Sequence, residues 1–473
     1  MNGLWVITSI ALCAIKTGSS FSMNPYPKAK GFCDVNADVG KPLYLTPYIE
    51  SGKLAEGRKA AVVPPLLDNI VSYSGFLTVN KKHDSNIFFW FFPAEESPET
   101  APVALWLQGG PGASSIYATF KENGPFRLLK NHEIGRKGHY WTRKLNVIYI
   151  DQPVGTGYSF TRNEAGYANN MSEVGQDLYA ALLQFFRLFP EYSKHEFLVT
   201  GESYAGKFIP AVAYTIHKSN PVSEQKINLK GIAIGDGWVD PYNMIDYANL
   251  LYNLDFIDLK TRSRFLKIEK RIKSLIDQKK FVDAFWALDN YFDADLTGYP
   301  PLVQNVTGIS FYYNFIEAQK NDSDDEMIYY LNQPKVRRST HVGNLTFNDQ
   351  NNEVERHLMV DELLSIVPWL EVLMDHYKVL LYNGQLDLIC AYPLTMNYVR
   401  KLKWKGAEEY ANADRKQWYV GKELAGYSKT AGNFTELLIR NAGHMVPGDQ
   451  PLWAMDMITN FAFNRPFKDR PHK

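Results

Sequence analysis

The stretch FLVTGESYAGKFIP, Phe197–Pro210, decides the fold of this chain. Its first four residues are apolar or β-branched and predict a buried strand, and the apolar spacing of Val212–His217 beyond it predicts a helix. Ser203 lies in the turn between them, with Gly201 two positions before it and Ala205 two positions after it. Small residues at those two places allow the sharp strand-to-helix turn that exposes a nucleophilic serine.

The same stretch also matches most of a phosphate-binding loop. Gly201 is followed after four residues by Gly206 and Lys207, as that motif requires. The next position must carry a hydroxyl for Mg²⁺, and the chain has Phe208 there. A nucleotide-dependent enzyme is therefore disfavoured. An ordinary serine in a strand–helix turn stays the alternative unless partners for Ser203 occur elsewhere in the sequence.

Short apolar runs on both sides of this unit predict a sheet. The runs expected as strands are Ile87–Phe92, Val103–Leu107, Val147–Ile150, Phe197–Thr200, Gly231–Ile234, Lys378–Tyr382 and Thr435–Ile439. Val174–Phe189 has helical spacing between two of them, and strand–helix–strand order favours a parallel crossover. Ser74–Phe92 instead predicts an antiparallel hairpin. We therefore predict an α/β fold with a mostly parallel central sheet and helices on both faces.

The pattern changes between residues 241 and 376. Strand-like runs disappear there, and a charged helical stretch extends from Leu259 to Tyr291. We predict a helical cap inserted over the carboxyl ends of the strands. The expected organisation is a signal peptide at 1–20, the first part of the core at 21–240, the cap at 241–376 and the second part of the core at 377–473.

Two later motifs supply partners for Ser203. An α/β-hydrolase carries its serine, acid and histidine in that order, with the acid and the histidine beyond late strands. The stretch KVLLYNGQLDLIC places Asp387 beyond the strand ending at Tyr382, and ELLIRNAGHMVPGDQP places His444 beyond Ile439. Open α/β sheets hold their sites at such carboxyl ends. We predict an α/β-hydrolase fold with Ser203, Asp387 and His444 as a catalytic triad.

The stretch WLQGGPGASS follows the strand Val103–Leu107. Gly109 and Gly110 have no side chains to block a substrate, so the backbone amide of Gly110 is a candidate oxyanion-hole donor. The second donor would be the amide of Tyr204, directly after the nucleophile. A simple glycine turn is the alternative for this loop.

Composition excludes several classes of function. The chain has 473 residues, with 51 Lys and Arg against 51 Asp and Glu, so its net charge is 0. A neutral chain lacks the positive field that attracts nucleic acid, and no such partner is expected. With 45% apolar and 22% charged residues the chain is not a disordered type. No metal or other cofactor is expected, because three cysteines and no HExxH motif supply no zinc site.

The N-terminus and the sequons predict the secretory route. An apolar run from Leu4 to Ile15 has the length of a signal-peptide core, and no run is long enough for a membrane span. Five Asn-x-Ser/Thr acceptors are candidates for glycosylation: Asn170, Asn305, Asn321, Asn344 and Asn433. We expect a secreted or lysosomal protein. A disulfide between Cys33 and Cys390, and a homodimer, both stay open.

Five ordered motifs together resemble the serine carboxypeptidase family. They are WLQGGPGASS, IDQPVGTGYSF, GESYAGKFIP, NGQLDLIC and AGHMVPGDQP. The resemblance runs from about Leu45 to the C-terminus, and INLKGIAIGDG (Ile227–Gly237) is most similar to the vitellogenic-like branch. The resemblance implies the triad and the oxyanion hole named above, with a peptide C-terminus as substrate.

The resemblance also implies a set of residues that bind the C-terminal carboxylate of the substrate. The set maps to Gln108, Gly109, Glu122 and Glu202, with Trp106 holding the cluster together. Gln108 replaces the asparagine of many members, which moves the amide outward by one methylene. Met445 is a candidate for the pocket of the leaving residue, although it could also only pack in the core.

The expected function is therefore a serine-type carboxypeptidase that releases C-terminal amino acids from peptides through an acyl-enzyme. Carboxyls that bind a carboxylate must be protonated, so activity should be favoured at acid pH, and Glu202→Gln should weaken its fall at alkaline pH. Two alternatives are an acyltransferase or esterase on the same scaffold, and a protective or storage protein with a minor catalytic role.

Overall fold

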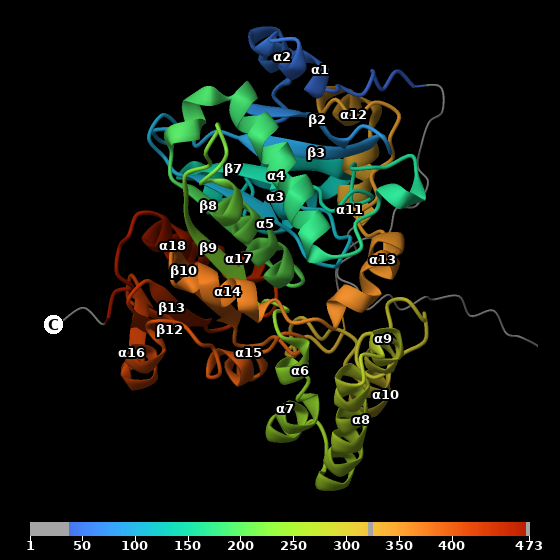
Figure 1. The fold of residues 1–473 in the computed structure, drawn as a ribbon, viewed down its shortest axis with the longest axis vertical. Helices are drawn as coiled ribbons and strands as arrows, with labels where there is room; N and C mark the ends of the chain where they lie inside the picture. The colour runs from blue at the N-terminus through green and yellow to red at the C-terminus, as the bar shows by residue number, and fades with distance from the viewer. Residues whose placement is uncertain (1–36, 320–324, 470–473) are drawn as a thin grey trace, which may run out of the picture.

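A computed structural model describes residues 37–319 and 325–469, and it is built around one large sheet (Figure 1). The predicted signal peptide, Cys33 and Asn321 lie outside the described residues. The sheet has eleven strands in the order β1-β2-β3-β7-β4-β8-β9-β10-β13-β12-β11. Their bounds are β1 Val62–Val63, β2 Ser72–Asn80, β3 Ser85–Phe92, β4 Val103–Leu107, β7 Asn146–Ile150, β8 Phe197–Glu202, β9 Leu229–Gly235, β10 Lys378–Gly384, β11 Lys416–Val420, β12 Glu423–Ala431 and β13 Phe434–Ile439. A separate hairpin pairs β5 (Phe126–Leu129) with β6 (Glu133–Arg136).

The six central strands, β7 to β13 in sheet order, are all parallel. Antiparallel strands flank them on both sides: β1, β2 and β3 at one edge, β12 and β11 at the other. The α/β fold and the hairpin are thus confirmed. Strands β11 and β12 were not expected from the sequence, because one of their faces is solvated and their apolar residues form no continuous run.

Helices cover the sheet between its strands. Those outside the segment between β9 and β10 are α1 Thr46–Glu50, α2 Leu54–Ala60, α3 Ile116–Lys121, α4 Met171–Leu188, α5 Ala205–Ser219, α15 Tyr392–Val399, α16 Ala407–Asn412, α17 Val446–Asp449 and α18 Pro451–Ala462. Helix α4 begins where the Oδ1 of Asn170 accepts the backbone N–H of Glu173, 3.0 Å away, which satisfies one free amide of its first turn.

The central strands bury both of their faces, and alternate residues therefore enter two different cores. On β4, Leu105 and Leu107 belong to one core, which is closed by α4 and α5. Trp106, between them in sequence, belongs to the other core, which is closed by α3 and α18. Because successive side chains of a strand point to opposite faces, the continuous apolar runs of the sequence correspond to strands covered on both sides.

The segment between β9 and β10 is helical. Its helices are α6 Pro241–Met244, α7 Tyr247–Asn253, α8 Leu259–Asp277, α9 Phe281–Asp289, α10 Leu302–Thr307, α11 Asp325–Asn332, α12 Pro334–Ser339, α13 Asn352–Glu362 and α14 Val367–Met374. The charged helical stretch expected from Leu259 to Tyr291 consists of two helices, and the chain between them turns through Lys279 at a φ of 58°.

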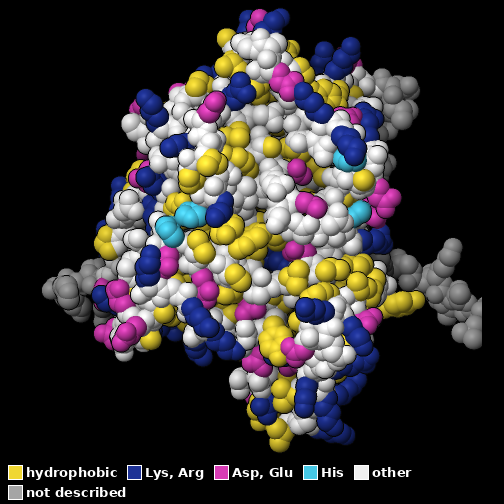
Figure 2. All heavy atoms as spheres, viewed as in Figure 1, with side chains coloured by type: hydrophobic (Ala, Val, Ile, Leu, Met, Phe, Trp, Pro, Cys, Tyr) yellow, Lys and Arg dark blue, Asp and Glu magenta, His cyan; other side chains and the backbone are white. Residues whose placement is uncertain are grey.

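Helices α7 to α10 project from the lower end of the molecule, whereas α14 packs on α5 (Figure 1). Lys and Arg side chains gather over that lower end, where α8 lies (Figure 2). The segment thus has a projecting part and a part that joins the core. The domain boundaries drawn from the sequence stay a prediction.

Candidate active site

Ser203 lies on a strained turn between β8 and α5. Its φ is 63°, in the left-handed region that a residue with a side chain rarely adopts. The adjacent strand leaves no room for a side chain at Gly201: a Cβ there would lie 2.1 Å from the carbonyl oxygen of Leu107. The turn predicted from the small residues around Ser203 is therefore present, and it holds the serine at the carboxyl end of the parallel strands.

Asp387 and His444 form a buried pair. The Nδ1 of His444 lies 2.9 Å from the Oδ2 of Asp387, and both side chains are fully buried. The backbone amides of Ile389 and Cys390 also donate to this carboxylate, at 3.0 and 3.1 Å. These donors fix the carboxylate, which in turn orients the imidazole ring.

The other nitrogen of the imidazole is available. Among the described residues, the Nε2 of His444 is buried and has no hydrogen-bond partner. A buried nitrogen without a hydrogen-bond partner costs free energy. In an active site, such an atom indicates a group that bonds to the nucleophile or to the substrate. In enzymes without bound substrate, the hydrogen bond between nucleophile and base is often long and tightens only in the complex.

Asp236 is a residue of the site that the sequence analysis missed. It directly follows β9 and is fully buried, and its Oδ1 accepts the backbone N–H of Gly384 at 2.9 Å. Burial, together with the nearby charge of Asp387, raises the pKa of Asp236 well above its usual range, so Asp236 carries a proton and donates to Asp387. Its position at the carboxyl end of β9, the strand beside β10, was the signal that could have found it.

The glycine loop after β4 lies against the nucleophile. A Cβ on Gly109 would be 2.5 Å from the Cβ of Ser203 and 2.6 Å from the backbone nitrogen of Tyr204, so only glycine fits there. Gly110 follows with a φ of 104°. The loop therefore brings its backbone beside the amide of Tyr204, as an oxyanion hole requires.

The residues expected to bind a carboxylate form one buried chain of hydrogen bonds. The Nε1 of Trp106 donates to the Oε1 of Gln108 at 3.0 Å, and the Nε2 of Gln108 donates to the Oε1 of Glu202 at 2.9 Å. Glu122, at the end of α3, is 1% exposed and interacts with Glu202. Gln108 thus fits the cluster: its amide connects the indole to the carboxyl pair.

The two glutamates hold protons more tightly than exposed carboxyls do. Burial, and then the charge of Glu122, raise the pKa of Glu202 well above its usual range. Burial also raises the pKa of Glu122, but hydrogen bonding from Glu202 and the charge of Lys137 oppose the effect, so its value is about 7. The pair therefore keeps one proton on Glu202 at neutral pH, and it gains the second on Glu122 below about pH 7.

Other predicted residues lie around this centre. Met445 is partly buried, and both Met445 and Glu122 lie near Gly448. Lys207 forms a buried ion pair with Asp361, with its Nζ 2.8 Å from the Oδ2 of that residue. Phe208 is buried in the core. Neither is placed to bind phosphate. Cys390 is buried and has no disulfide partner within residues 37–319 and 325–469.

The sequons fall mostly on the surface. Asn305, Asn344 and Asn433 are exposed, and Asn170 is half-buried at the start of α4. None of the helices among the described residues combines the length and apolarity that crossing a bilayer requires.

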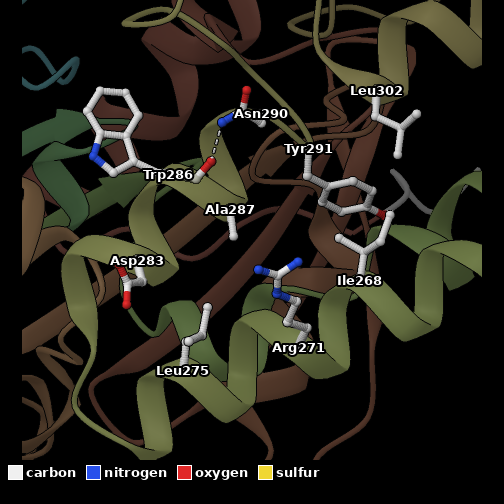
Figure 3. Close-up of a pocket in the computed structure, with 9 residues that line it drawn as sticks. All are labelled: Ile268, Arg271, Leu275, Asp283, Trp286, Ala287, Asn290, Tyr291 and Leu302. Carbon is white, nitrogen blue, oxygen red and sulfur yellow. Dashed lines mark hydrogen bonds between the residues drawn. The ribbon is translucent and has the colours of Figure 1, made fainter.

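A cavity opens directly in front of Ser203, and it is also lined by Gly110, Tyr204, Trp238 and Cys390. A second, larger cavity of about 640 Å³ lies between α8 and α9, where Arg271 and Leu275 face Ala287 (Figure 3). None of the predicted site residues lines that second cavity. The chemistry therefore belongs to the first cavity.

Two groups of side chains bring possible metal-ligating atoms within 4.8 Å of one another: Asp236 with Asp387 and His444, and Asp289 with Asp293 and Asp295. In the first group the carboxylate and the imidazole are already bonded to each other, so an ion would have to break that pair. The second group lies in the helical segment near the cavity of Ser203.

Comparison with known proteins identifies the family. The family model described as serine carboxypeptidase matches residues 65–464. The chain belongs to the serine carboxypeptidase family. It is similar to the venom serine carboxypeptidase of Apis mellifera, with 51% identity over 94% of this chain and 96% of that protein. It is also similar to the vitellogenic carboxypeptidase of Aedes aegypti, with 45% identity over 96% and 98%.

A solved structure supports the fold alone. The prohormone-processing carboxypeptidase Kex1 of Saccharomyces cerevisiae aligns with a TM-score of 0.75, covering 86% of this chain and 96% of that chain at 24% identity. The α/β-hydrolase fold and the family resemblance drawn from the motifs are confirmed, and the protein is a serine-type peptide hydrolase of the carboxypeptidase class.

Proposed function

We propose that this serine carboxypeptidase cleaves the last peptide bond of its substrates with Ser203, His444 and Asp387. The observation that carries the proposal is the pair of buried carboxyls beside the nucleophile. Glu202 directly precedes Ser203 in sequence, and Glu122 interacts with it. Two buried carboxyls that can hold protons offer donors to a free carboxylate, which favours a carboxypeptidase over an esterase or acyltransferase.

The reaction begins at the hydroxyl of Ser203. Its oxygen attacks the carbonyl carbon of the last peptide bond, and its proton moves to the Nε2 of His444. The carbonyl oxygen becomes an oxyanion that accepts from the backbone amides of Gly110 and Tyr204. Asp387 stabilises the imidazolium that forms.

The intermediate then loses the C-terminal residue. His444 donates its proton to the nitrogen of the scissile bond, the C–N bond breaks, and the amino acid leaves while the rest of the peptide stays as an ester on Ser203. Water attacks this ester with His444 as the base, and the proton returns through His444 to the serine oxygen.

The carboxylate of the leaving residue binds the cluster of Gln108, Gly109, Glu122 and Glu202, and Met445 packs near its side chain. A protonated glutamate donates a hydrogen bond to the carboxylate, whereas an ionised one repels it. Because the pKa of Glu122 is about 7, binding is strong in acid solution and weakens as the pH rises through that value. This supports a role in an acidic or extracellular compartment, reached by the secretory route with glycans on the exposed sequons.

Paired peptides test the proposal. One peptide carries a free C-terminal carboxylate and the other a C-terminal amide, and release of the last residue is followed by mass spectrometry at pH 5. We expect fast release from the free peptide and at least tenfold slower release from the amide, because the cluster loses its charged partner. Equal rates would contradict the role of Glu122 and Glu202.

A further inference from the structure

The cavity in front of Ser203 has apolar walls and acidic groups. Its walls include Leu288, Phe292 and Tyr247, and the rings of Phe292 and Tyr247 stack with their centres 3.9 Å apart. Two carboxyls also line it: Asp293, from the turn after α9, and Glu362, the last residue of α13. Both come from the segment between β9 and β10.

Two of the neutral polar side chains of this cavity are already bonded, whereas the hydroxyl of Tyr204 is buried without a partner among the described residues. The Nε1 of Trp238 donates to the backbone oxygen of Glu362 at 3.2 Å, and the hydroxyl of Tyr247 donates to the backbone oxygen of Ile389 at 2.9 Å. The side chain of Glu362 differs: the residue is 9% exposed, and its Oε2 has no hydrogen-bond partner among the described residues. The cavity therefore contains a buried acceptor without a donor.

More acid lies behind these two carboxyls. Asp289, Asp295 and Glu355 are close enough to one another to interact, and burial raises the pKa of each of them. The nearby cation is Lys207, and its ammonium is already occupied by the carboxylate of Asp361 and the backbone oxygens of Asp361 and Leu364. Burial likewise raises the pKa of Glu362 to about 8 and that of Asp293 well above its usual range, so the cluster holds protons until a cation binds and lets its carboxyls ionise.

We propose that this cavity binds a basic side chain, arginine or lysine, of the substrate, and that Glu362 and Asp293 select it. The inference rests on the proposed function and extends it to side-chain preference. A lysine or arginine combines an apolar stem with a charged tip, which matches apolar walls that lead to carboxyls. The rings of Tyr247 and Phe292 add the favourable contact of a cation with aromatic faces.

The basic residue is the one before the scissile bond. The cavity includes Ser203 and both candidate oxyanion donors, Gly110 and Tyr204, but none of Gln108, Glu122 or Glu202 lines it. Because those three residues hold the C-terminal carboxylate, the leaving residue lies on their side of the nucleophile. The residue on the acyl side then faces the cavity.

The test uses N-acylated dipeptides that share C-terminal phenylalanine and differ in the residue before it: arginine, lysine, citrulline, norleucine or glutamate. Citrulline has the shape of arginine without its charge. We expect kcat/KM at pH 6 to be at least tenfold higher for arginine than for citrulline, with glutamate poorest, because a charge-assisted bond to a buried carboxylate is lost.

Two variants and a control assign the effect to the cavity. In Glu362→Gln and in Asp293→Asn, the ratio of kcat/KM for the arginine substrate to kcat/KM for the citrulline substrate should fall toward one. Glu353→Gln changes an exposed acid on the same helix, which pairs with Arg356 at the surface, and should leave the ratio unchanged. Labelling with an active-site serine phosphonate shows that each variant is folded.

The failure of this inference is distinct from that of the proposed function. Release of phenylalanine from all five substrates with an arginine-to-citrulline ratio near one would overturn the basic preference alone. No release from any substrate would overturn the proposed function.

A metal is the rival occupant of the acid cluster, since Asp289, Asp293 and Asp295 could ligate one. If the carboxyls select a side chain, the ratio should be the same in EDTA and in millimolar Ca²⁺. A ratio near one together with a melting temperature that rises with Ca²⁺ would replace the proposal with a cation site.

Discussion

Two groups of buried carboxyls flank Ser203, and they are built in different ways. Glu202 is the last residue of β8 and Glu122 directly follows α3, and a hydrogen-bond chain from Trp106 through Gln108 ends at Glu202. Asp293, in the turn after α9, and Glu362, at the end of α13, come from the segment between β9 and β10 and lie near other acids that interact with one another. In the first group Glu202 accepts from the amide of Gln108, although the oxygens of Glu122 have no hydrogen-bond partner among the described residues, whereas the second group has more carboxyls and no such amide donor to Glu362.

The difference indicates different partners. A pair of carboxyls that shares its protons can donate to an anion, and the first group has the geometry for a carboxylate. A larger cluster of buried carboxyls without a cationic partner is stabilised by a bound cation, which lets the carboxyls ionise. The same residue types thus give opposite preferences on the two sides of one nucleophile, because the number of nearby donors differs.

The largest effect on activity is expected when the hydroxyl of Ser203, which lies between the two clusters, is removed. Ser203→Ala should lower kcat by roughly 10⁴-fold or more, because no other group can form the acyl-enzyme. The variant should still bind a peptide with a free C-terminus at pH 5, as measured by calorimetry. Residual trimming at near wild-type rate would show that the nucleophile is another residue.

The second cluster depends on a buried cation for stability. Lys207→Met should lower the free energy of unfolding by roughly 3–5 kcal/mol, because Asp361 then stays buried without its partner beside further acids. Denaturant titration measures the loss. Lys405→Met removes a lysine that is 76% exposed, and should change stability by less than about 1 kcal/mol. Equal small effects would mean that the buried pair contributes no net stability.

The first cluster should set the alkaline side of the pH profile. Glu122 is protonated below about pH 7 and ionised above it, so kcat/KM for peptides should fall as the pH rises through 7. Glutamine donates at any pH, so Glu122→Gln should flatten this fall, which we expect to be roughly ten- to 150-fold. A C-terminally amidated peptide serves as the control, since it has no carboxylate to repel. An unchanged profile in the variant would assign the fall to another group.

The smallest effect concerns Asp236, which belongs to neither cluster. Asp236→Asn keeps a donor for Asp387 and should retain kcat/KM within about fivefold, whereas Asp236→Ala removes the donor and should cost at least about tenfold. The contrast between the two variants separates positioning of the triad from simple packing. Equal losses in both would contradict a proton on Asp236.

Much of this could be predicted from the sequence because the signals are local. The apolar runs defined the central strands, since a strand covered on both faces needs apolar residues at every position. Strands β11 and β12, at one end of the sheet, gave no such run. The helical stretch expected over Leu259–Tyr291 did not reveal the break into two helices, because periodicity continues across the turn at Lys279. The residues of the site were predicted where they stand beside glycines that a sharp turn requires.

The amino-acid sequence by itself determined the fold and the family, because strand patterns and turn motifs depend on residues that are close together in the sequence. It also placed Glu202 next to Ser203 without any need for the structure. Only the tertiary structure placed Asp236 near Asp387, or Asp293 and Glu362 in one cavity with Ser203, although they are far apart in the chain. The physical reason is that charge acts through space: which carboxyls interact, and which have no donor, depends on burial and distance and not on order along the chain.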